Sequence, residues 1–489
     1  MASFASSFLH TARRKPLAAG VATLFAVSAS SAWATPPAVT NCNDSGVGSL
    51  RYAVDPLNGA ISGDTIDFSA LTADDPGCAS STITLTTGSI VVPQQNLTFK
   101  GNGQRGISIA NFAANSRVIT HSYPTAAGHL YFQDTKVNDG HITGTGQVYG
   151  GCIATLGSLT LNDVEIYECS ATTTGLSTDS PQPLAWGGGV FAGAALEIYG
   201  HSLLDHNVVY ATNANVRAQG GCAMTTGAFD MSDSIVAVCS AVGPIGGGRV
   251  RGGALELKGG SVTITRSIIA KSNSTFIVGG VDLNNGSGGP ATATISNSSI
   301  AYNYANYVFG GLYANSDQFS LNNSTIVLNT ARYDTYVYNT QTYNAGVGVS
   351  IGSVSGSFSL QSTIIANNAA DGTQEDLAFG ASTGLTFAAS NNLVRAYGAD
   401  VTLPGGQGNL APGTCPLLGS VRNNGGGTYT FAPQSGSPVI DAGNNLANEP
   451  YDQRGAGYAR VSGPSADIGS HEVQKADIIF YAAFETNCL

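Results

Sequence analysis

Short stretches of alternating apolar and polar residues recur through the middle of the chain. Each of seven copies starts with glycine, continues with a short apolar strand and a turn of small residues, and ends with a longer alternating strand. The copies begin at Gly150, Gly188, Gly220, Gly252, Gly279, Gly310 and Gly346. Each alternating strand holds two apolar residues two positions apart, and these pairs are Leu159/Leu161, Leu196/Ile198, Phe229/Met231, Val262/Ile264, Ala293/Ile295, Phe319/Leu321 and Phe358/Leu360. A period of two predicts β-strands with both members of a pair on one face, and its repetition predicts copies stacked in register.

The repeat predicts an all-β fold, a right-handed parallel β-helix (solenoid) with an N-terminal helical cap and a C-terminal cap. A step of roughly thirty residues suits one coil of two or three short strands. A leucine-rich repeat is disfavoured because no consensus leucine ladder is present, and a propeller because its blades need four strands each. An asparagine follows the second strand in several copies, where it suits a turn and can hydrogen-bond along the stack. These residues are Asn207, Asn303, Asn329 and Asn367.

Weaker strand patterns extend the predicted solenoid in both directions. They lie at 83–85, 90–92, 97–99, 107–109, 118–119 and 130–132 before the repeats, and at 385–387, 393–394 and 429–431 after them. The predicted organisation is a signal peptide at 1–34, an N-terminal cap at 35–80, the β-helix at 81–431, a C-terminal cap at 432–475 and a tail at 476–489.

The first 34 residues have the pattern of a secretory signal peptide. Basic residues at 13–15 precede an apolar run at 17–27, and Ala32-Trp33-Ala34 fits a cleavage site. The apolar run is short for a membrane span, and no other stretch could cross a membrane as a helix. We therefore expect an exported chain with no transmembrane segment in its mature form.

Composition narrows the possible partners. Charged residues make up 10% of the chain, and the formal net charge is −11. An acidic chain is a poor ligand for nucleic acid, and it is not generally attracted to acidic polysaccharides, although a local basic cleft is compatible with this charge. We expect no nucleic-acid partner and a monomeric protein.

Two cysteine pairs repeat within the coils. Cys152 and Cys222 each follow Gly-Gly, and Cys169 and Cys239 each lie the same distance further along the chain. The intervening coil has Val190 in place of the first cysteine and an asparagine in place of the second. Because the two cysteines occur together or not at all, the pattern predicts the disulfides Cys152–Cys169 and Cys222–Cys239.

The other four cysteines complete the predicted set. Cys42–Cys78 would close the N-terminal cap, which leaves Cys415 to pair with Cys488. A metal site is disfavoured because CxxC spacing and nearby histidines are missing. We expect no cofactor and no metal.

Two groups of motifs flank the repeats. The first comprises 44–54 (Asp-Ser-Gly-Val-Gly-Ser-Leu-Arg-Tyr-Ala-Val), 64–68 (Asp-Thr-Ile-Asp-Phe) and 83–88 (Ile-Thr-Leu-Thr-Thr-Gly). The second comprises 436–443 (Gly-Ser-Pro-Val-Ile-Asp-Ala-Gly), 452–455 (Asp-Gln-Arg-Gly), Arg460 and 467–469 (Asp-Ile-Gly). In this order around Gly-Gly coils, they resemble the choice-of-anchor Q domain family of bacterial exported proteins over nearly the whole mature chain. The resemblance implies a pectin-lyase-like β-helix at the bacterial cell surface, outside the cell or in the periplasm, and no established chemistry.

The motif residues also have a direct physical interpretation. Ser49 can cap a short helix that places Leu50, Ala53 and Val54 on one face, so that the helix covers the first coil. Five charged residues gather near the other end, where they predict a salt-bridged lid over the last coil. They are Asp441, Asp452, Arg454, Arg460 and Asp467.

An enzymatic alternative depends on one group of basic residues within the coils. A polysaccharide lyase needs an Arg or Lys to remove the proton α to a carboxylate, and Ca²⁺ or basic residues to neutralise that carboxylate. The candidates are Arg249, Arg251, Lys258, Arg266 and Lys271, with Asp282 and Asp205 from neighbouring coils. The grouped carboxylates and Arg-x-Pro-x-x-Arg of pectate lyases and the Asn-Thr-Asp, Asp-Asp and Gly-His-Gly signatures of polygalacturonases are absent from the coils. Ca²⁺ would enter only under this alternative.

Tyrosines crowd into two successive insertions between coils. They are Tyr302, Tyr304, Tyr307, Tyr313, Tyr333, Tyr336, Tyr338 and Tyr343. A tyrosine ring offers a flat apolar face for sugars, although the same rings can stack on one another to order the loops. We therefore expect a non-catalytic, adhesin-like or glycan-binding surface protein. A polysaccharide lyase or glycoside hydrolase of pectin-lyase-like fold is the first alternative, and an architectural envelope protein is the second.

Overall fold

The computed structural model describes residues 36–104, 106–244, 250–284, 289–338, 341–344, 346–352, 356–371, 373–380, 384–398, 401–404, 407–474 and 488, with the backbone alone for 336–338 and 341–344. Thr35–Leu489 form one compact unit. The predicted signal peptide lies outside the described residues, as does the predicted tail apart from Cys488. Within these ranges, no helix is long and apolar enough to cross a membrane.

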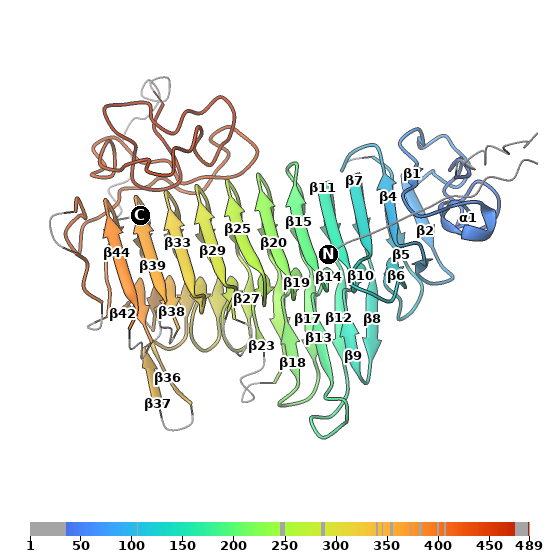
Figure 1. Ribbon diagram of the computed structural model, residues 1–489, viewed down its shortest axis with the longest axis horizontal. Coiled ribbons are helices and arrows are strands. Elements are labelled where there is room, and N and C mark those ends of the chain that lie inside the picture. The colour runs from blue at the N-terminus through green and yellow to red at the C-terminus, as the bar shows by residue number, and fades with distance from the viewer. Residues whose placement is uncertain are drawn as a thin grey trace, which may run out of the picture. The chain divides into compact units, whose positions relative to one another are not determined.

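A large sheet of parallel strands forms one side of the coils, and each coil contributes to it in two successive rows. The first row, seen as upright arrows in Figure 1, comprises β1 (Thr65–Asp67), β4 (Asn96–Lys100), β7 (His129–Asn138), β11 (Ser158–Tyr167), β15 (Ala195–Tyr199), β20 (Ala228–Ser232), β25 (Ser261–Thr265), β29 (Thr292–Ser296), β33 (Gln318–Asn322), β39 (Ser357–Gln361) and β44 (Thr386–Ser390). The strands β7 and β11 extend into the second row. The rest of the second row comprises β2 (Thr82–Leu85), β5 (Ser108–Asn111), β16 (Leu203–Asp205), β21 (Ile235–Ala237), β26 (Ile268–Ala270), β30 (Ser299–Ala301), β34 (Thr325–Val327), β40 (Ile364–Ala366) and β45 (Leu393–Val394).

Three further sheets and a hairpin complete the described strands. The ten-stranded sheet comprises β3 (Ile90–Val92), β6 (Ile119–His121), β10 (Ile153–Thr155), β14 (Val190–Ala192), β19 (Ala223–Thr225), β24 (Leu255–Leu257), β28 (Val281–Leu283), β32 (Leu312–Ala314), β38 (Val349–Ile351) and β43 (Leu377–Phe379). The nine-stranded sheet comprises β8 (His141–Gly144), β12 (Ser170–Thr173), β17 (Val208–Ala211), β22 (Ser240–Val242), β27 (Asn273–Ser274), β31 (Tyr304–Ala305), β35 (Thr330–Ala331), β41 (Ala369–Ala370) and β42 (Thr373–Gln374). The four-stranded sheet comprises β9 (Gln147–Tyr149), β13 (Leu184–Trp186), β18 (Arg217–Gln219) and β23 (Val250–Arg251), and the antiparallel hairpin comprises β36 (Thr335–Tyr338) and β37 (Gln341–Asn344).

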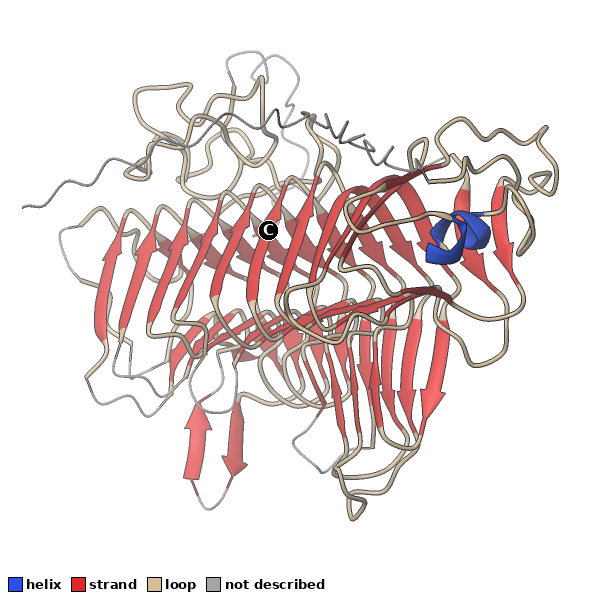
Figure 2. Ribbon diagram, turned by 45° about the vertical axis from the view of Figure 1, so that its right-hand side comes forward, coloured by secondary structure: helices blue, strands red, loops and turns tan. Residues whose placement is uncertain are grey.

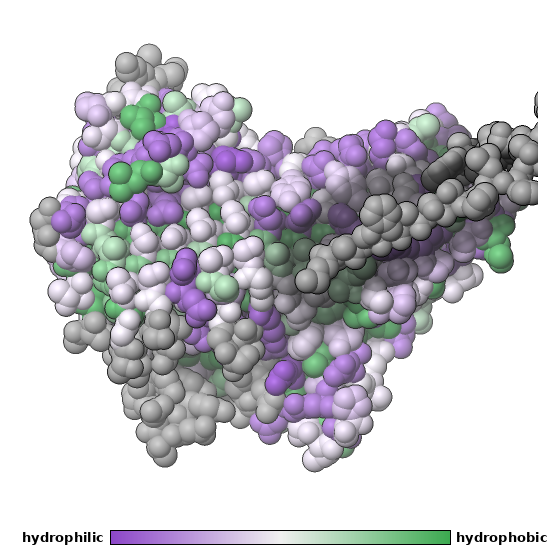
Figure 3. Space-filling model, in the orientation of Figure 1, coloured by the Kyte–Doolittle hydropathy of each residue, from purple (hydrophilic) through white to green (hydrophobic). Residues whose placement is uncertain are grey.

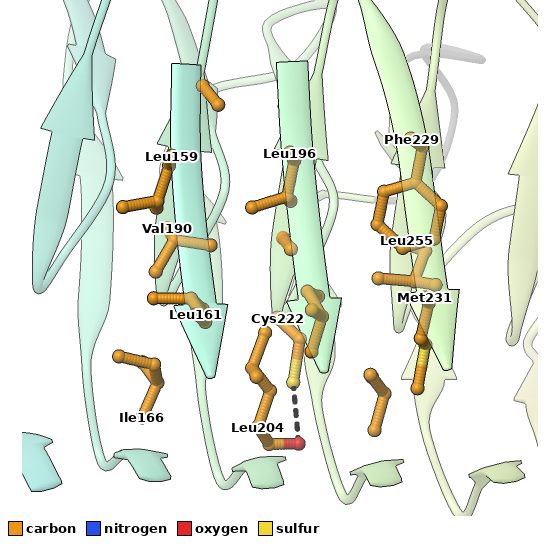
Figure 4. Packing of buried hydrophobic residues seen from close by; sticks show 14 of the residues in the cluster. Leu159, Leu161, Ile166, Val190, Leu196, Leu204, Cys222, Phe229, Met231 and Leu255 are labelled. Atoms are coloured by element: carbon orange, nitrogen blue, oxygen red, sulfur yellow. Dashed lines mark hydrogen bonds between the residues drawn. The ribbon is translucent and has the colours of Figure 1, made fainter. Parts of the chain in front are cut away.

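Equivalent apolar residues meet in register, as the sequence predicts. The first member of each apolar pair is the partner of the next along the stack, in the order Leu159, Leu196, Phe229, Val262, Ala293, Phe319 and Phe358. All seven are buried in the main core, and Figure 4 shows the first three on successive strands. Burying each large side chain contributes roughly 1.5–3 kcal/mol, which a single coil could not gain alone. The predicted right-handed parallel β-helix is therefore confirmed.

The asparagine ladder exists, but one of its predicted members is wrong. Asn303 Nδ2 donates to Asn329 Oδ1 at 3.0 Å, and Asn329 Nδ2 donates to Asn368 Oδ1 at 2.9 Å. Asn368 therefore continues the ladder in place of Asn367. Asn367 is in the left-handed conformation at φ 60°, which suits a turn, and its side chain bonds outside the ladder, to the carbonyl oxygen of Cys488.

The sequence analysis missed a second ladder of side chains. It lies at the turn between the two rows of the large sheet, where each backbone N–H bonds to the side chain of the next coil. Its members are Ser267, Ser298, Ser324, Thr363 and Asn392. Serine holds this position in three successive coils and threonine and asparagine replace it in the next two, so the residue type changes along the ladder.

The N-terminal motif folds into the predicted cap. Ser49 accepts a hydrogen bond from the Tyr52 N–H as the N-cap of α1 (Leu50–Val54), which η1 (Pro56–Asn58) follows. Arg51 pairs with Asp44 at 2.7 Å and also donates to the carbonyl oxygens of Gly88 and Ser89. The capping motif is thereby attached to the first coils.

The C-terminal segment 395–474 lies elsewhere than predicted. Figures 1 and 2 show its loops along the ends of the strands of the large sheet, beside several coils. Ser299, Thr325 and Ser362 on three different coils bond to it. Residues 429–431 belong to this segment, where Thr430 forms one antiparallel bridge instead of a strand in the stack. The predicted position of this segment, as a lid over the last coil, is therefore wrong. The segment packs instead on the apolar outer face of the second row of strands.

An ion pair forms within the predicted set of five charged residues, between Arg454 and Asp452, whereas Arg460 pairs with Glu472, a residue outside that set. Arg454 contacts Asp452 at 2.7 Å, and Arg460 contacts Glu472 at 2.9 Å. These four side chains are almost fully buried, so each pair compensates charges that would otherwise be costly in the interior.

All four predicted disulfides are present: Cys42–Cys78, Cys152–Cys169, Cys222–Cys239 and Cys415–Cys488. The alignment used to predict two of them is wrong by one residue, because Val190 pairs with Ile153 and Ala223. The residue in register with Cys152 and Cys222 is Gly189. A Cβ on Gly189 would lie 3.0 Å from Asn207 Cγ, so the asparagine side chain fills the space that a disulfide fills in the neighbouring coils.

Candidate functional site

Charged side chains are sparse on the coils, so a place where several meet is the first candidate for a site. Over the strands of the large sheet, Figure 3 shows mostly pale and light-green residues with scattered purple ones. Arg251, Glu256, Lys258 and Asp282 gather instead between the ten-stranded and four-stranded sheets, beside Trp186. We name these five residues the Glu256 cluster.

Strand geometry brings the two acidic residues together. In β24, Leu255 and Leu257 face the main core, so Glu256 between them faces the opposite side. The same alternation in β28 turns Asp282 outward. Glu256 and Asp282 are register partners on these neighbouring parallel strands, which places one carboxyl group beside the other.

The four-stranded sheet supplies the opposing row. Trp186, Gln219 and Arg251 are the last residues of β13, β18 and β23, and they lie in register. After each of them, the chain turns into the ten-stranded sheet through a glycine with positive φ. One of these is Gly252, whose added Cβ would lie only 3.0 Å from Glu256 Oε2, so the turn leaves little free space around that carboxyl group.

Hydrogen bonds fix the two basic residues of the cluster. Arg251 Nε donates to Asp282 Oδ2 at 2.5 Å, and Arg251 Nη2 donates to Oδ1 at 3.1 Å. Lys258 Nζ donates to Gln219 Oε1 at 2.6 Å and lies 4.6 Å from the ring centre of Trp186. The side chains of Arg251 and Lys258 are 18% and 13% exposed, whereas Asp282 is fully buried. The two cations therefore lie nearer to the solvent than the carboxyl groups, although all four side chains are mostly buried.

Glu256 is the unusual member. It is 1% exposed, and neither of its carboxyl oxygens has a hydrogen-bond partner among the described residues. Lys258 Nζ lies 3.5 Å from Oε1. Burial, and then the nearby Asp282, raise the pKa of Glu256 to about 8, although Lys258 and Arg251 oppose the shift. Burial therefore favours the protonated form of Glu256.

Burial and the neighbouring charges also shift the pKa values of the two basic residues. Burial lowers the pKa of Lys258, with Glu256 acting in the opposite direction. Burial also opposes the charge on Arg251, but the ion pair with Asp282 outweighs it and raises the pKa of Arg251. When Glu256 is protonated and Lys258 is charged, the two cations outnumber the one carboxylate of Asp282.

The structure divides the basic group predicted from the sequence. Arg251, Lys258 and Asp282 meet as described, whereas Arg266 pairs with Asp233 at the turn between the two rows of the large sheet. Lys271 is exposed at the next turn, before the nine-stranded sheet. The prediction of a single basic site is therefore wrong for these two residues, because their turns lie on other sides of the coil. Asp205 lies on β16, away from the cluster, and Arg249 is outside the described residues.

The predicted tyrosine strip is divided as well. Tyr307 stacks on Phe276 and meets Tyr333 edge-on, with ring centres 5.0 and 5.1 Å apart. Tyr302 lies elsewhere, against Phe431 of the C-terminal segment, because its turn faces that segment. Tyr304 is 40% exposed on β31. These contacts show that part of the set orders its own loops.

Of the remaining tyrosines, Tyr313 packs against the same apolar cluster as Tyr307. Tyr313 contacts Phe309 at 4.8 Å and lies under the guanidinium of Arg251 at 5.5 Å, beside the Glu256 cluster. The side chains of Tyr336, Tyr338 and Tyr343, on the β36–β37 hairpin, lie outside the described residues.

Sequence reasoning missed Glu256, Trp186 and Gln219. A signal for Glu256 was present, since it is an acidic residue flanked by two core leucines in a short strand. No comparable signal marks Trp186, because the four-stranded sheet has no repeated pattern in the sequence. Within the described ranges, no group of three or more His, Cys, Asp or Glu residues is placed to hold a metal ion. The Ca²⁺ of the lyase alternative therefore has no such ligand group there.

Comparison with known proteins adds little to this description. No family model matches the sequence, and no curated protein matches it. One solved structure, described as the crystal structure of pectate lyase Pel9A, aligns with 90% of this chain and 97% of its own. It is 16% identical with a TM-score of 0.31, so no argument about this chain depends on it.

Proposed function

We propose that this chain is an exported β-helix that binds carboxylate-bearing polysaccharides at the Glu256 cluster. The observation that carries the proposal is the position of the Lys258 ammonium, 4.6 Å from the ring centre of the partly exposed Trp186. Lys258 lies over the indole ring, and Tyr149 and Phe191 pack against it, so a sugar would contact the exposed part of the indole while the adjacent cation meets the carboxylate on that sugar. The four disulfides support export, because such bonds persist in oxidising compartments.

Binding of acidic polysaccharides would be a local property of the Glu256 cluster, because the chain as a whole is acidic. The formal net charge of −11 repels acidic polymers at long range, whereas the Glu256 cluster attracts them at short range. Salt screens the long-range repulsion more than the partly buried contact. We therefore expect binding of acidic glycans that persists at moderate salt.

The test compares glycans that differ in charge. Affinity electrophoresis of the purified protein in gels containing polygalacturonate, alginate or dextran should show retardation by the two acidic polymers alone. Trp186→Ala and Lys258→Ala should each reduce retardation about tenfold, since each removes one of the two contacts. Lys271→Ala is the matched control, because Lys271 is an exposed lysine on another side of the coil. Equal retardation of wild type, Trp186→Ala and Lys258→Ala would refute the proposal.

A second candidate function is cleavage of the same polymers by β-elimination. Burial lowers the pKa of Lys258, and a neutral lysine can remove the proton α to a uronate carboxylate. Arg251 remains charged and could neutralise that carboxylate. The C–H electron pair forms the double bond in the sugar, the bond to the β-oxygen breaks, and the departing oxygen takes up the proton that Lys258 removed. The ultraviolet absorbance of the unsaturated product tests this: product from the wild type but not from Lys258→Ala supports cleavage, and binding without product leaves a non-catalytic binding protein.

We also propose that the chain belongs to the choice-of-anchor Q family. Supporting this, residues from separate motifs contact one another: Asp44 accepts hydrogen bonds from Arg51 and Thr86. At the other end, Arg460 donates to Glu472 and to the backbone oxygen of Asp467. An alignment of family members tests the proposal, because these contacting positions should then be retained together.

A further inference from the structure

We propose that Glu256 determines whether the site accepts an anion, acting as an internal competitor for Lys258. When protonated, Glu256 leaves the ammonium available to a ligand carboxylate. When ionised, it becomes the counter-ion of Lys258 itself. This inference rests on the proposed binding function. It adds Glu256 as a residue whose protonation state decides whether the site binds an anion.

The geometry supports this role without reference to titration. The Glu256 carboxyl group is 1% exposed, and both of its oxygens lack hydrogen-bond partners in the described part of the chain. Buried carboxylates are normally paired with a cation, and the Lys258 ammonium, 3.5 Å from Oε1, is placed to serve as that cation. The ammonium is bonded to Gln219 and lies beside Trp186, on the partly exposed side of the cluster.

Among the charged groups around Glu256, Lys258 is the one that can change its partner. The titratable and charged groups around Glu256 are Asp282 on β28, Arg251 on β23, Arg217 on β18, Tyr313 on β32 and Lys258 just after β24. Asp282 is held by both of its oxygens on Arg251, so it cannot exchange partners freely. Ionisation of Glu256 therefore adds one negative charge beside Lys258, whose Nζ lies 3.5 Å away, while Arg251, which also favours this charge, is already paired with Asp282.

The direction of the pH effect follows from these charges. The raised pKa of Glu256, about 8, means that the cluster has an excess of positive charge below this pH and loses one unit above it. Lys258 has a lowered pKa and is coupled to Glu256, so loss of its own proton would weaken anion binding in the same direction. The experiment must therefore separate the two groups.

Replacing Lys258 with arginine separates them, because arginine stays charged. The affinity of full-length Lys258→Arg protein for a galacturonate oligosaccharide should fall about tenfold between pH 6.5 and 9.5, which is roughly the effect of one nearby charge. The double variant Glu256→Gln, Lys258→Arg should keep its affinity constant over this range. A constant affinity in Lys258→Arg, or an undiminished fall in the double variant, would overturn the inference.

Tryptophan fluorescence gives a readout that needs no ligand. Trp186 lies under Lys258, and the other tryptophan, Trp33, is common to all variants. The fluorescence of Lys258→Arg minus that of the double variant should therefore change as pH rises through about 8. If this transition appears but no uronate binds at any pH, the protonation change is real, the competition for a ligand is refuted, and the proposed function fails. If uronate binds but no transition appears, only the role of Glu256 fails.

Discussion

Arg460 and Glu472 form an ion pair of 2.9 Å inside the C-terminal segment, where neither side chain is more than 1% exposed. Glu472 also accepts from the backbone N–H groups of Ser462 and Asp467, so the pair connects several loops. Removing one partner would leave the other charge buried and unpaired. The pair therefore holds together loops that contain no regular secondary structure of their own.

We expect Arg460→Met to destabilise the protein by about 3–5 kcal/mol, the usual cost of leaving a buried charge without its partner. The control is Lys100→Met, which removes a pair with Asp67 whose side chains are 40% and 45% exposed. That change should cost less than about 1 kcal/mol. Thermal unfolding followed by circular dichroism measures both, and similar losses in the two variants would contradict the structural role of the Arg460 pair.

Stability should decrease between pH 5 and pH 9. Burial raises the pKa of Glu256 to about 8, and those of Asp376 and Glu472 to about 7. These three groups then bind more protons in the folded protein than in the unfolded chain, so their contribution to the free energy of unfolding falls as pH rises through these values. Urea unfolding at pH 5, 7 and 9 checks the direction, and the opposite trend would be evidence against these shifts.

Glu256→Gln provides the matched variant for this effect. Glutamine has the same shape, and the carboxyl oxygens that it replaces have no hydrogen-bond partners to lose. The variant should match the wild type at pH 5 and be more stable than the wild type at pH 9, with a melting temperature higher by several degrees. A variant less stable than the wild type at both pH values would show that Glu256 makes contacts the structure does not reveal.

The repeated fold was predictable because its signal is periodic. Leu159 and Leu196 occupy the same step of a two-residue alternation, and they are register partners in the structure. Cysteines repeat in the same way, so their pairing followed from equivalent positions even though Val190 was aligned one residue too early. That error arose because the intervening coil has three glycines, at 187–189, and only backbone pairing shows which of them matches a cysteine.

The candidate site was only partly predictable because its members belong to different sheets. Arg251, Lys258 and Asp282 could be identified as charged residues of neighbouring coils, but so could Arg266 and Lys271. Which of these meet depends on the direction in which each turn leaves the coil, and a one-dimensional spacing does not contain that direction. Glu256 was missed because its pKa and its lack of partners arise from burial between sheets, which no local pattern encodes.

The asparagine ladder should contribute to stability at each step. Asn329 is fully buried, donates to Asn368 and accepts from the Asn303 N–H and Nδ2. Asn329→Ala should therefore destabilise the protein by about 1–3 kcal/mol, because it leaves buried polar groups unpaired. Asn96→Ala is the control at an exposed position of β4, and it should change stability by less than about 0.5 kcal/mol. Equal effects on the melting temperature would argue against a structural ladder.

The coil between the two cysteine-bearing coils shows which residues can take the place of a disulfide. There, Gly189 and Asn207 occupy the cysteine positions, and Asn207 Nδ2 donates to the Ile166 oxygen at 2.9 Å. Removing Cys222–Cys239 by two alanines should cost roughly 3 kcal/mol. The pair Cys222→Gly, Cys239→Asn should lose less, because it restores that hydrogen bond in the same space. Denaturant midpoints of the two double variants test this, and a larger loss for the Gly/Asn pair would be inconsistent with equivalent positions.

Two described surfaces of this chain carry partly exposed aromatic rings, and if both bind sugars, as proposed for the first, their ligands should differ in charge. Trp186 lies beside Lys258 and Arg251, whereas the exposed Tyr304 lies on the nine-stranded sheet with its hydroxyl group bonded to Asn306. Trp186→Ala should therefore weaken binding of acidic glycans about tenfold and leave neutral glycans unaffected. Tyr304→Ala should do the reverse if neutral sugars stack there, with a loss on the order of 1 kcal/mol per ring.

A glycan array probed with the wild type and these two variants measures both effects, and melting temperatures show whether either ring is needed for stability. Tyr304 packs less than Tyr307, so its removal should change the melting temperature by less than about 2 °C. If Tyr304→Ala lowers stability and no neutral glycan binds the wild type, the tyrosines serve only to order their loops. The Glu256 cluster would then be the single glycan surface among the described residues for which the structure gives an argument.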